Sequence, residues 1–160
     1  MPRVIVLDTF PLSCAGKRIP SPGASLTLSE ECHQWLRACV TAGNQIIAPA
    51  ICYYEVMREM ERLGANSQIN RIRQFCFTTS GRFLSITDGH LESAAKLWAL
   101  ARNQGTPTAS AEALDGDVIL AAQMQSLGLL KAQAVLATTN VGHLSLFVNA
   151  QLWTEISPGS

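Results

Sequence analysis

Four acidic side chains stand beside or within apolar segments, at intervals along the whole chain. Asp8 follows a short β-branched run, Glu55 lies in a long amphipathic segment, and Asp115 and Asp117 precede an apolar helical run. A carboxylate beside buried segments is costly unless it caps a helix, pairs with a cation or binds a metal. Three or four carboxylates converging on one edge form an oxygen-ligand site for a hard divalent cation, Mg²⁺ or Mn²⁺. The sequence therefore predicts such a site if folding brings Asp8, Glu55 and Asp117 together, with Asp115 as a further member or a helix cap.

Other catalytic chemistries lack the residues that they need. Neither a glycine-rich phosphate loop nor a Gly-x-Ser-x-Gly turn is present. Phosphatases with an aspartyl nucleophile need a second Asp two places after the first, where this chain has Phe10. Cys32 and His33 with Cys39 do not match the spacing of a standard zinc site. Carboxylate chemistry with a divalent cation is what remains.

The composition is that of one folded domain spanning residues 1–160. Hydrophobic residues make up 48% of the chain, charged residues 15%, and the formal net charge is zero. A neutral chain has no global basic field that would indicate nucleic acid binding, although a local basic patch is compatible with it. The first residues do not form a signal peptide, no apolar window is long enough for a membrane span, and the five cysteines contain no Cys-x-x-Cys pair. We expect a cytoplasmic protein with reduced thiols.

Short apolar runs alternate with helical patterns along the chain. The predicted strands are 3–7, 45–48, 82–86, 134–137 and 152–156. The predicted helices are 28–42, 50–63, 67–77, 88–105 and 117–127, with loops at 14–25 and 106–112. Thr27 with Glu30 matches a capping box, and Gly64 is a helix stop. This alternation predicts a three-layer α/β domain with a mainly parallel sheet of four to five strands flanked by helices.

Two polar residues fall where parallel strands end. Asp8 ends the first predicted strand, and Asn140 follows the fourth. Active sites of open parallel sheets lie at the carboxyl ends of the strands. We therefore expect both residues at the functional edge.

Four segments in this order resemble the PIN-domain ribonucleases, specifically toxins of the VapC type. Residues 6–9 with Leu12 resemble the opening strand and first acid, and residues 50–56 with Arg58 resemble the helix that bears the second acid. Residues 117–122 resemble the third acid with its buried helix, and residues 136–140 with His143 resemble the segment that closes the site. The resemblance spans nearly the whole chain and includes the order of strands and helices. One departure is Asn140, which stands where many relatives have Asp.

The resemblance implies a metal-dependent endoribonuclease with a PIN-like fold that cleaves RNA by hydrolysis. Asp8, Glu55 and Asp117 would hold Mg²⁺ or Mn²⁺, and Asn140 would complete the catalytic set as a polar residue without charge. Further site residues implied are Asp115, Thr9 and His143. A cognate antitoxin and a homodimer also follow from the resemblance alone.

Two alternatives stay open from the sequence. The first is a catalytically weak PIN-like module that binds RNA or protein. Asn140, which adds no charge to the site, and the zero net charge of the chain motivate this alternative. A DNA nuclease of the same fold is the second. The arginines Arg58, Arg62, Arg71 and Arg73 are interpreted as a solvated face, with contact to RNA phosphates or to antitoxin carboxylates as the functional alternative.

Overall fold

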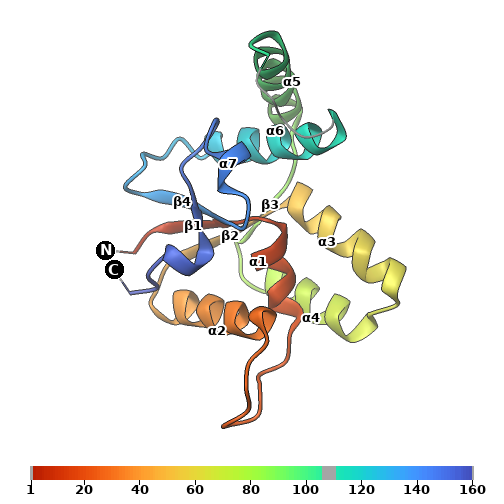
Figure 1. Cartoon of the computed structure of the whole chain (residues 1–160), viewed down its shortest axis with the longest axis vertical. Coiled ribbons are helices and arrows are strands. Elements are labelled where there is room, and N and C mark those ends of the chain that lie inside the picture. Colours follow the sequence, from red (N-terminus) through yellow and green to blue (C-terminus); the bar gives the residue numbers. More distant parts are fainter. Residues whose placement is uncertain (1, 106–110, 160) are drawn as a thin grey trace.

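The computed structural model describes residues 2–105 and 111–159, and within them the strands form one parallel sheet in the order β3-β2-β1-β4-β5 (Figure 1). The strands are β1 (Val4–Leu7), β2 (Gln45–Pro49), β3 (Phe83–Leu84), β4 (Ala134–Thr138) and β5 (Ala150–Leu152). The α-helices are α1 (Thr9–Ser13), α2 (Leu28–Thr41), α3 (Ala50–Leu63), α4 (Asn66–Phe77), α5 (Asp88–Asn103), α6 (Ala111–Gln125) and α7 (Val141–Leu144). Short 3-10 segments are η1 (Cys14–Gly16) and η2 (Trp153–Glu155). The predicted α/β class, with a parallel sheet flanked by helices, is confirmed.

The centre of the sheet is β1, which pairs with β2 on one side and β4 on the other. Val4 lies opposite both Gln45 and Ala134, and every pairing is parallel. The carboxyl ends of β1, β2 and β4 therefore share one edge of the sheet. That edge is where α1, α3 and α7 begin, so residues that follow these strands lie close together although they are far apart in sequence.

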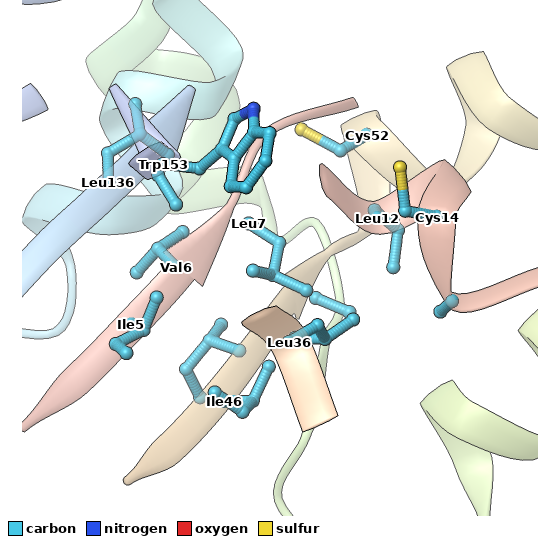
Figure 2. Packing of buried hydrophobic residues seen from close by; sticks show 14 of the residues in the cluster. Ile5, Val6, Leu7, Leu12, Cys14, Leu36, Ile46, Cys52, Leu136 and Trp153 are labelled. Carbon is cyan, nitrogen blue, oxygen red and sulfur yellow. The ribbon is translucent and has the colours of Figure 1, made fainter. Parts of the chain in front are cut away.

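Helices cover both faces of the sheet, with α2 on one side and α6 on the other (Figure 1). The main core contains the buried side chains of β1 and β4 and the inner faces of α2, α3 and α4. Figure 2 shows Leu36 of α2 packed towards Leu7 and Ile46, and Trp153 beside Leu136. Burial of each such side chain stabilises the folded protein by about 1.5–3 kcal/mol, which holds the sheet and its covering helices together.

The predicted helix ends at α2 and α3 are confirmed. The Thr27 hydroxyl oxygen accepts the Glu30 backbone N–H at the start of α2, and the Glu30 carboxylate accepts the Thr27 backbone N–H. These two bonds form the expected capping box. Gly64 ends α3 with a φ of 66°, the left-handed region that glycine adopts without strain. These ends fix how α3, the helix that carries Glu55, leaves the sheet.

The predicted start of the helix at Asp117 is wrong. Helix α6 already includes Ala111, so Asp115 and Asp117 lie inside it and neither is an N-cap. Alanine, glutamate and leucine at 111–114 are good helix formers and extend the helix towards the N-terminus. Of the predicted loop 106–112, residues 106–110 lie outside the described residues, and the last two are helical.

Several other boundaries differ from the sequence prediction. The loop predicted at 14–25 begins with the buried segment η1, and α1 before it was not predicted. The strand expected at 82–86 is reduced to two residues, and the one expected at 152–156 lies at Ala150–Leu152. Both are edge strands, and their length depends on the partner strand; β5, for example, pairs only with Leu136–Thr138 of β4. On α3, Val56 and Met57 are buried whereas Leu63 is 59% exposed, so the buried face of the helix stops before its last turn.

Helix α5 packs against α6 and projects from the rest of the molecule, whereas α6 itself lies over the sheet (Figure 1). Their contact is a second, smaller apolar cluster formed by Ala94, Ala101, Leu114, Val118 and Ala122. Within the described residues, no helix is both long and apolar enough to cross a membrane.

Candidate active site

Both carboxylate oxygens of Asp8 are held by neighbours from separate parts of the chain. Asp8 is the N-cap of α1, and its Oδ1 accepts the Thr9 backbone N–H at 2.7 Å. Its Oδ2 accepts the Thr138 hydroxyl at 2.7 Å, from the end of β4. The Cys52 thiol of α3 donates to Oδ1 at 3.7 Å. The first predicted acid is therefore oriented at the carboxyl edge of the sheet by groups from three elements.

Glu55 faces Asp8 from α3 and is joined to it through Thr9. The Thr9 hydroxyl donates to Glu55 Oε1 at 3.0 Å, while the backbone of the same residue bonds Asp8. The guanidinium of Arg58 lies 3.7 Å from Glu55 Oε2. Thr9, which the resemblance implied as a further site residue, thus brings the first two predicted acids into one site.

Glu55 also reaches α6, because α6 has a glycine at the point of contact. A Cβ built on Gly116 would lie 3.3 Å from Glu55 Oε2, tighter than ordinary van der Waals contact. Gly116 stands between Asp115 and Asp117 in the sequence. A side chain at this position would push Glu55 or α6 away, so the glycine permits the close approach of the second and third acids.

Asp117 lies in the electrostatic field of both other acids. Its side chain is 22% exposed. Burial, the charge of Asp8 and the charge of Glu55 raise its pKa to about 6, against an opposing effect of His143. The His143 Nδ1 atom lies 3.9 Å from Asp117 Oδ2. The three acids therefore form one cluster in which ionisation of Asp117 is opposed by its neighbours.

The remaining predicted site residues differ in how close they lie to the three acids. His143, on α7, is next to Asp117, as described above. Asn140 has an exposed side chain, and its backbone N–H donates to the Thr138 hydroxyl oxygen at 2.9 Å, which connects its position to the group that holds Asp8. Asp115 is exposed and lines a groove against α5 with Leu91 and Trp98, so the structure separates it from the other acids.

Thr138 and Cys52 contact Asp8, and sequence reasoning assigned neither of them a role. Thr138 lies in the predicted fourth segment, at the end of a strand, which is a signal that could have identified it. Cys52 is fully buried, and burial followed by the charges of Asp8 and Glu55 raises the pKa of its thiol. A thiol that stays protonated is a donor to Asp8 rather than a nucleophile.

The chemistry of the donor set fits a hard divalent cation. The clustered groups are carboxylates with threonine hydroxyls, which are oxygen ligands. Burial and then the charges of Asp8 and Glu55 raise the pKa of Asp117, and a bound cation would offset both effects. Within residues 2–105 and 111–159, no three His, Cys, Asp or Glu side chains are already spaced as a metal-ligand group. Asp8, Glu55 and Asp117 would have to close on the ion by side-chain movement.

Comparison with known proteins gives structural matches only. No model of a protein family matches the sequence, and no curated protein matches it. Among solved structures, FitAcB from Neisseria gonorrhoeae matches with a TM-score of 0.64 and 19% identity over 95% of this chain and 99% of that chain. The chain has a PIN-like α/β fold.

Two further solved structures agree. VapBC2 from Rickettsia felis, bound to a DNA fragment from its promoter, matches with a TM-score of 0.61 and 14% identity, over 93% of this chain and 96% of that chain. VapBC-1 from nontypeable Haemophilus influenzae matches with a TM-score of 0.59 and 18% identity, over 95% and 99%. The resemblance found in the sequence is therefore confirmed for the fold, across nearly the full length of each chain.

Proposed function

We propose that this protein is a metal-dependent endoribonuclease and the toxin of a toxin–antitoxin pair. The observation that carries the proposal is the link made by Thr9 between Asp8 and Glu55 at the carboxyl edge of the sheet, beside Asp117. Separate elements supply these acids, and the arrangement suits a site for Mg²⁺ or Mn²⁺ and a phosphodiester substrate. Fold similarity to VapBC and FitAcB structures supports the antitoxin partner; the homodimer and the cytoplasmic location are further parts of the proposal.

The proposed reaction is hydrolysis of a phosphodiester bond. A water oxygen forms a bond to phosphorus, the bond from phosphorus to the leaving ester oxygen breaks, and the water proton passes to a carboxylate while the leaving oxygen gains a proton. A bound Mg²⁺ or Mn²⁺ would supply Lewis acidity and lower the pKa of the attacking water. Asp8, Glu55 and Asp117 are the residues that would hold it.

The residues of the chain orient this chemistry. The Thr138 hydroxyl and the Thr9 N–H fix the two oxygens of Asp8, and the Thr9 hydroxyl fixes Glu55. His143 lies beside Asp117 Oδ2 and favours its ionised form. Arg58, beside Glu55, offers a cation to a substrate phosphate. Asn140 can orient water or phosphate without adding charge.

The test is cleavage of a labelled single-stranded RNA with Mn²⁺ by proteins that keep the shape of each acid but lose its charge. Asp8→Asn, Glu55→Gln and Asp117→Asn should each lower the rate by at least about 100-fold, because the loss of a charged metal ligand removes several kcal/mol. Asp115→Asn is the matched control on the same helix and should retain activity within about threefold, because its side chain faces α5.

Three outcomes would contradict the proposal. Full cleavage in excess EDTA would exclude metal dependence, and retention of activity by all three neutral variants would exclude the carboxylate site. RNA binding that is equal with and without chelator, but without cleavage, would instead support the binding module. A DNA strand of the same sequence tests the remaining alternative, a DNA nuclease.

A further inference from the structure

A basic hollow of about 870 Å³ lies between η1, α2 and α4, outside the acidic cluster. Its lining includes five of the 12 Lys and Arg residues of the chain: Lys17, Arg18, Arg37, Arg71 and Arg82. No Asp or Glu is among the described residues that line it. In a protein with zero net charge, this concentrates almost half of the basic side chains in one concave surface and creates a local positive field.

The cations of the basic hollow are not neutralised by ion pairs. In the described part of the chain, the ion pairs join Arg58 with Glu55, Arg62 with Glu59 and His143 with Asp117, and none involves the hollow. Arg71 donates to the Gly16 carbonyl, and Arg82 donates to the Phe75 carbonyl while its guanidinium lies 4.3 Å from the centre of the Phe75 ring. Neutral carbonyls and a ring therefore position these two arginines and leave their charges uncompensated.

Lys17 acts on one acid of α2, Glu30. Its charge lowers the pKa of Glu30, after the larger effects of the hydrogen bonds that Thr27 gives. That carboxylate already accepts the Thr27 backbone N–H in the capping box of α2. Glu30 is thus held within the helix cap, and among the described residues it forms no ion pair with Lys17.

Two residues that line the hollow, His33 and Arg82, each have a buried polar atom without a hydrogen-bond partner. His33 is only 9% exposed, and its Nδ1 lies 2.9 Å from the Cys14 carbonyl oxygen, so Nδ1 carries the hydrogen and donates it. The opposite ring nitrogen, His33 Nε2, and the Nε atom of Arg82 are buried without a hydrogen-bond partner. The Arg82 Nε–H is a charged donor without a partner and suits an anion oxygen, whereas His33 Nε2, with the hydrogen on Nδ1, is an acceptor and gives an anion no hydrogen bond.

The hollow is close to the acidic cluster along the chain. Asp8 is the N-cap of α1, and η1 follows α1 directly; six residues at a helical rise of 1.5 Å place Cys14 about 9 Å from Asp8. In Figure 1, α1 lies between the end of β1 and the region where α2 and α4 meet. A flexible nucleic acid strand that enters the acidic cluster is thus within reach of the hollow.

We infer that the basic hollow binds backbone phosphates of the single-stranded RNA beside the bond to be cut. The inference rests on the proposed function. A cluster of three carboxylates repels a polyanion, so the substrate needs positive charge close to the cluster to stay bound. Phe75, the Arg82 guanidinium and the aliphatic stems of the other cations give bases an apolar surface, which favours RNA over an acidic peptide.

The test is fluorescence anisotropy with a labelled, unstructured single-stranded RNA of twelve nucleotides in EDTA. EDTA prevents metal-dependent cleavage, so binding is measured alone. Arg37→Gln and the double variant Lys17→Gln/Arg18→Gln should bind about 3- to 10-fold more weakly, and the slope of log affinity against log salt should fall by about 0.7 for each cation removed. Arg73→Gln is the matched control, because Arg73 is exposed on α4 and does not line the hollow. Its affinity should stay within about twofold of wild type.

Equal affinity of the hollow variants and wild type, or an equal loss in Arg73→Gln, would overturn the inference. Hollow-dependent binding of polyglutamate together with RNA binding that ignores the hollow would also overturn it, in favour of an acidic protein segment. A separate cleavage assay with Mn²⁺ distinguishes the two proposals. RNA binding that depends on the hollow, without cleavage, would support the phosphate-binding inference and contradict the proposed nuclease function. Cleavage with RNA binding that does not depend on the hollow would support the nuclease function and contradict the inference.

Discussion

Thr9 contacts two carboxylates through two different atoms, and this single residue connects the first strand with α3. Its N–H is held by Asp8 and its hydroxyl by Glu55. Thr138 performs the matching role on the other oxygen of Asp8. Hydrogen bonds to a carboxylate are worth about 1.5–3 kcal/mol, more than those between neutral groups. At the scale of the residue, the hydroxyl groups therefore determine which way the acids face.

Thr138→Val should lower the proposed Mn²⁺-dependent cleavage about tenfold, because it keeps the shape of the side chain but removes the donor to Asp8. Thr138→Ser retains the hydroxyl and should recover most of the rate. Single-turnover rates at saturating RNA measure this effect apart from binding. Equal activity of the Val and Ser variants would show that the hydroxyl does not orient Asp8.

Asp117→Asn should stabilise the metal-free protein by roughly 1 kcal/mol near pH 7, after allowance for the solvent screening of a half-buried group. The pKa of Asp117 is raised in the folded state from 3.8 to about 6, so the folded protein binds more protons than the unfolded chain between these values. Its contribution to stability therefore falls as pH rises from 3.8 to about 6.

Urea unfolding in EDTA at pH 4 and pH 7 measures this contribution. The gain from Asp117→Asn should be larger at pH 7 than at pH 4, because wild-type Asp117 is ionised only at the higher pH. Asp115→Asn, an exposed change on the same helix, should show no such difference. A gain independent of pH would contradict the electrostatic explanation.

At the scale of the element, α6 sets the distance between the second and third acids. Gly116 allows Glu55 to approach α6 on one turn, and Gln123 ties the same helix to its neighbours further along. Gln123 is 0% exposed; its Oε1 accepts the Ile51 N–H at the start of α3, and its Nε2 donates to the Leu84 carbonyl of β3. One buried amide thus holds three elements together.

Gln123→Leu should destabilise the protein by about 2–3 kcal/mol, because it removes both hydrogen bonds of a fully buried amide and leaves the partly buried Ile51 N–H and Leu84 carbonyl without that partner. Gln125→Leu, two residues on, removes a bond from an exposed side chain to Phe147 and should cost less than about 1 kcal/mol. Denaturant unfolding of both variants provides the comparison. Equal losses would show that the buried amide has no special part in placing α6.

At the scale of the whole molecule, a neutral chain separates its charges into an acidic edge and a basic hollow. Ionisation of Asp117 at the acidic edge is opposed by burial and by the charges of Asp8 and Glu55, which together raise its pKa. A cation that binds only the folded state should stabilise it by about 2.7 kcal/mol when its concentration is 100 times its Kd. For a domain of this size each kcal/mol corresponds to about 2–4 °C in Tm.

Titration with Mn²⁺ or Mg²⁺ should therefore raise the Tm of the wild-type protein by several degrees. Asp8→Asn should be more stable than wild type in EDTA, because it removes one repelling charge, and should respond less to the metal. Ca²⁺ serves as a comparison cation, and Asp115→Asn should behave as wild type. A Tm that is unchanged by Mn²⁺ in both wild type and Asp8→Asn would argue against the metal site.

Much of the fold was predictable because it depends on residues that are neighbours in sequence. The β-branched run before Asp8, the capping box of Thr27 with Glu30, and the glycine stop at Gly64 act within one strand or one helical turn. The alternation of short apolar strands with helical segments was enough to predict the α/β class and the mainly parallel sheet. The position of Asp8 at the end of a strand followed from the same local pattern.

The contacts between elements that are distant in sequence were decided only by the tertiary structure. Thr138 reaches Asp8 across 130 positions because β4 pairs directly with β1, a strand order that no local pattern specifies. Asp117 lies inside α6 rather than at its start, since helix propensity upstream outweighed the capping preference of aspartate. The basic hollow likewise exists only where η1, α2 and α4 meet, because charges scattered through a neutral sequence gain a common field once packing brings them together.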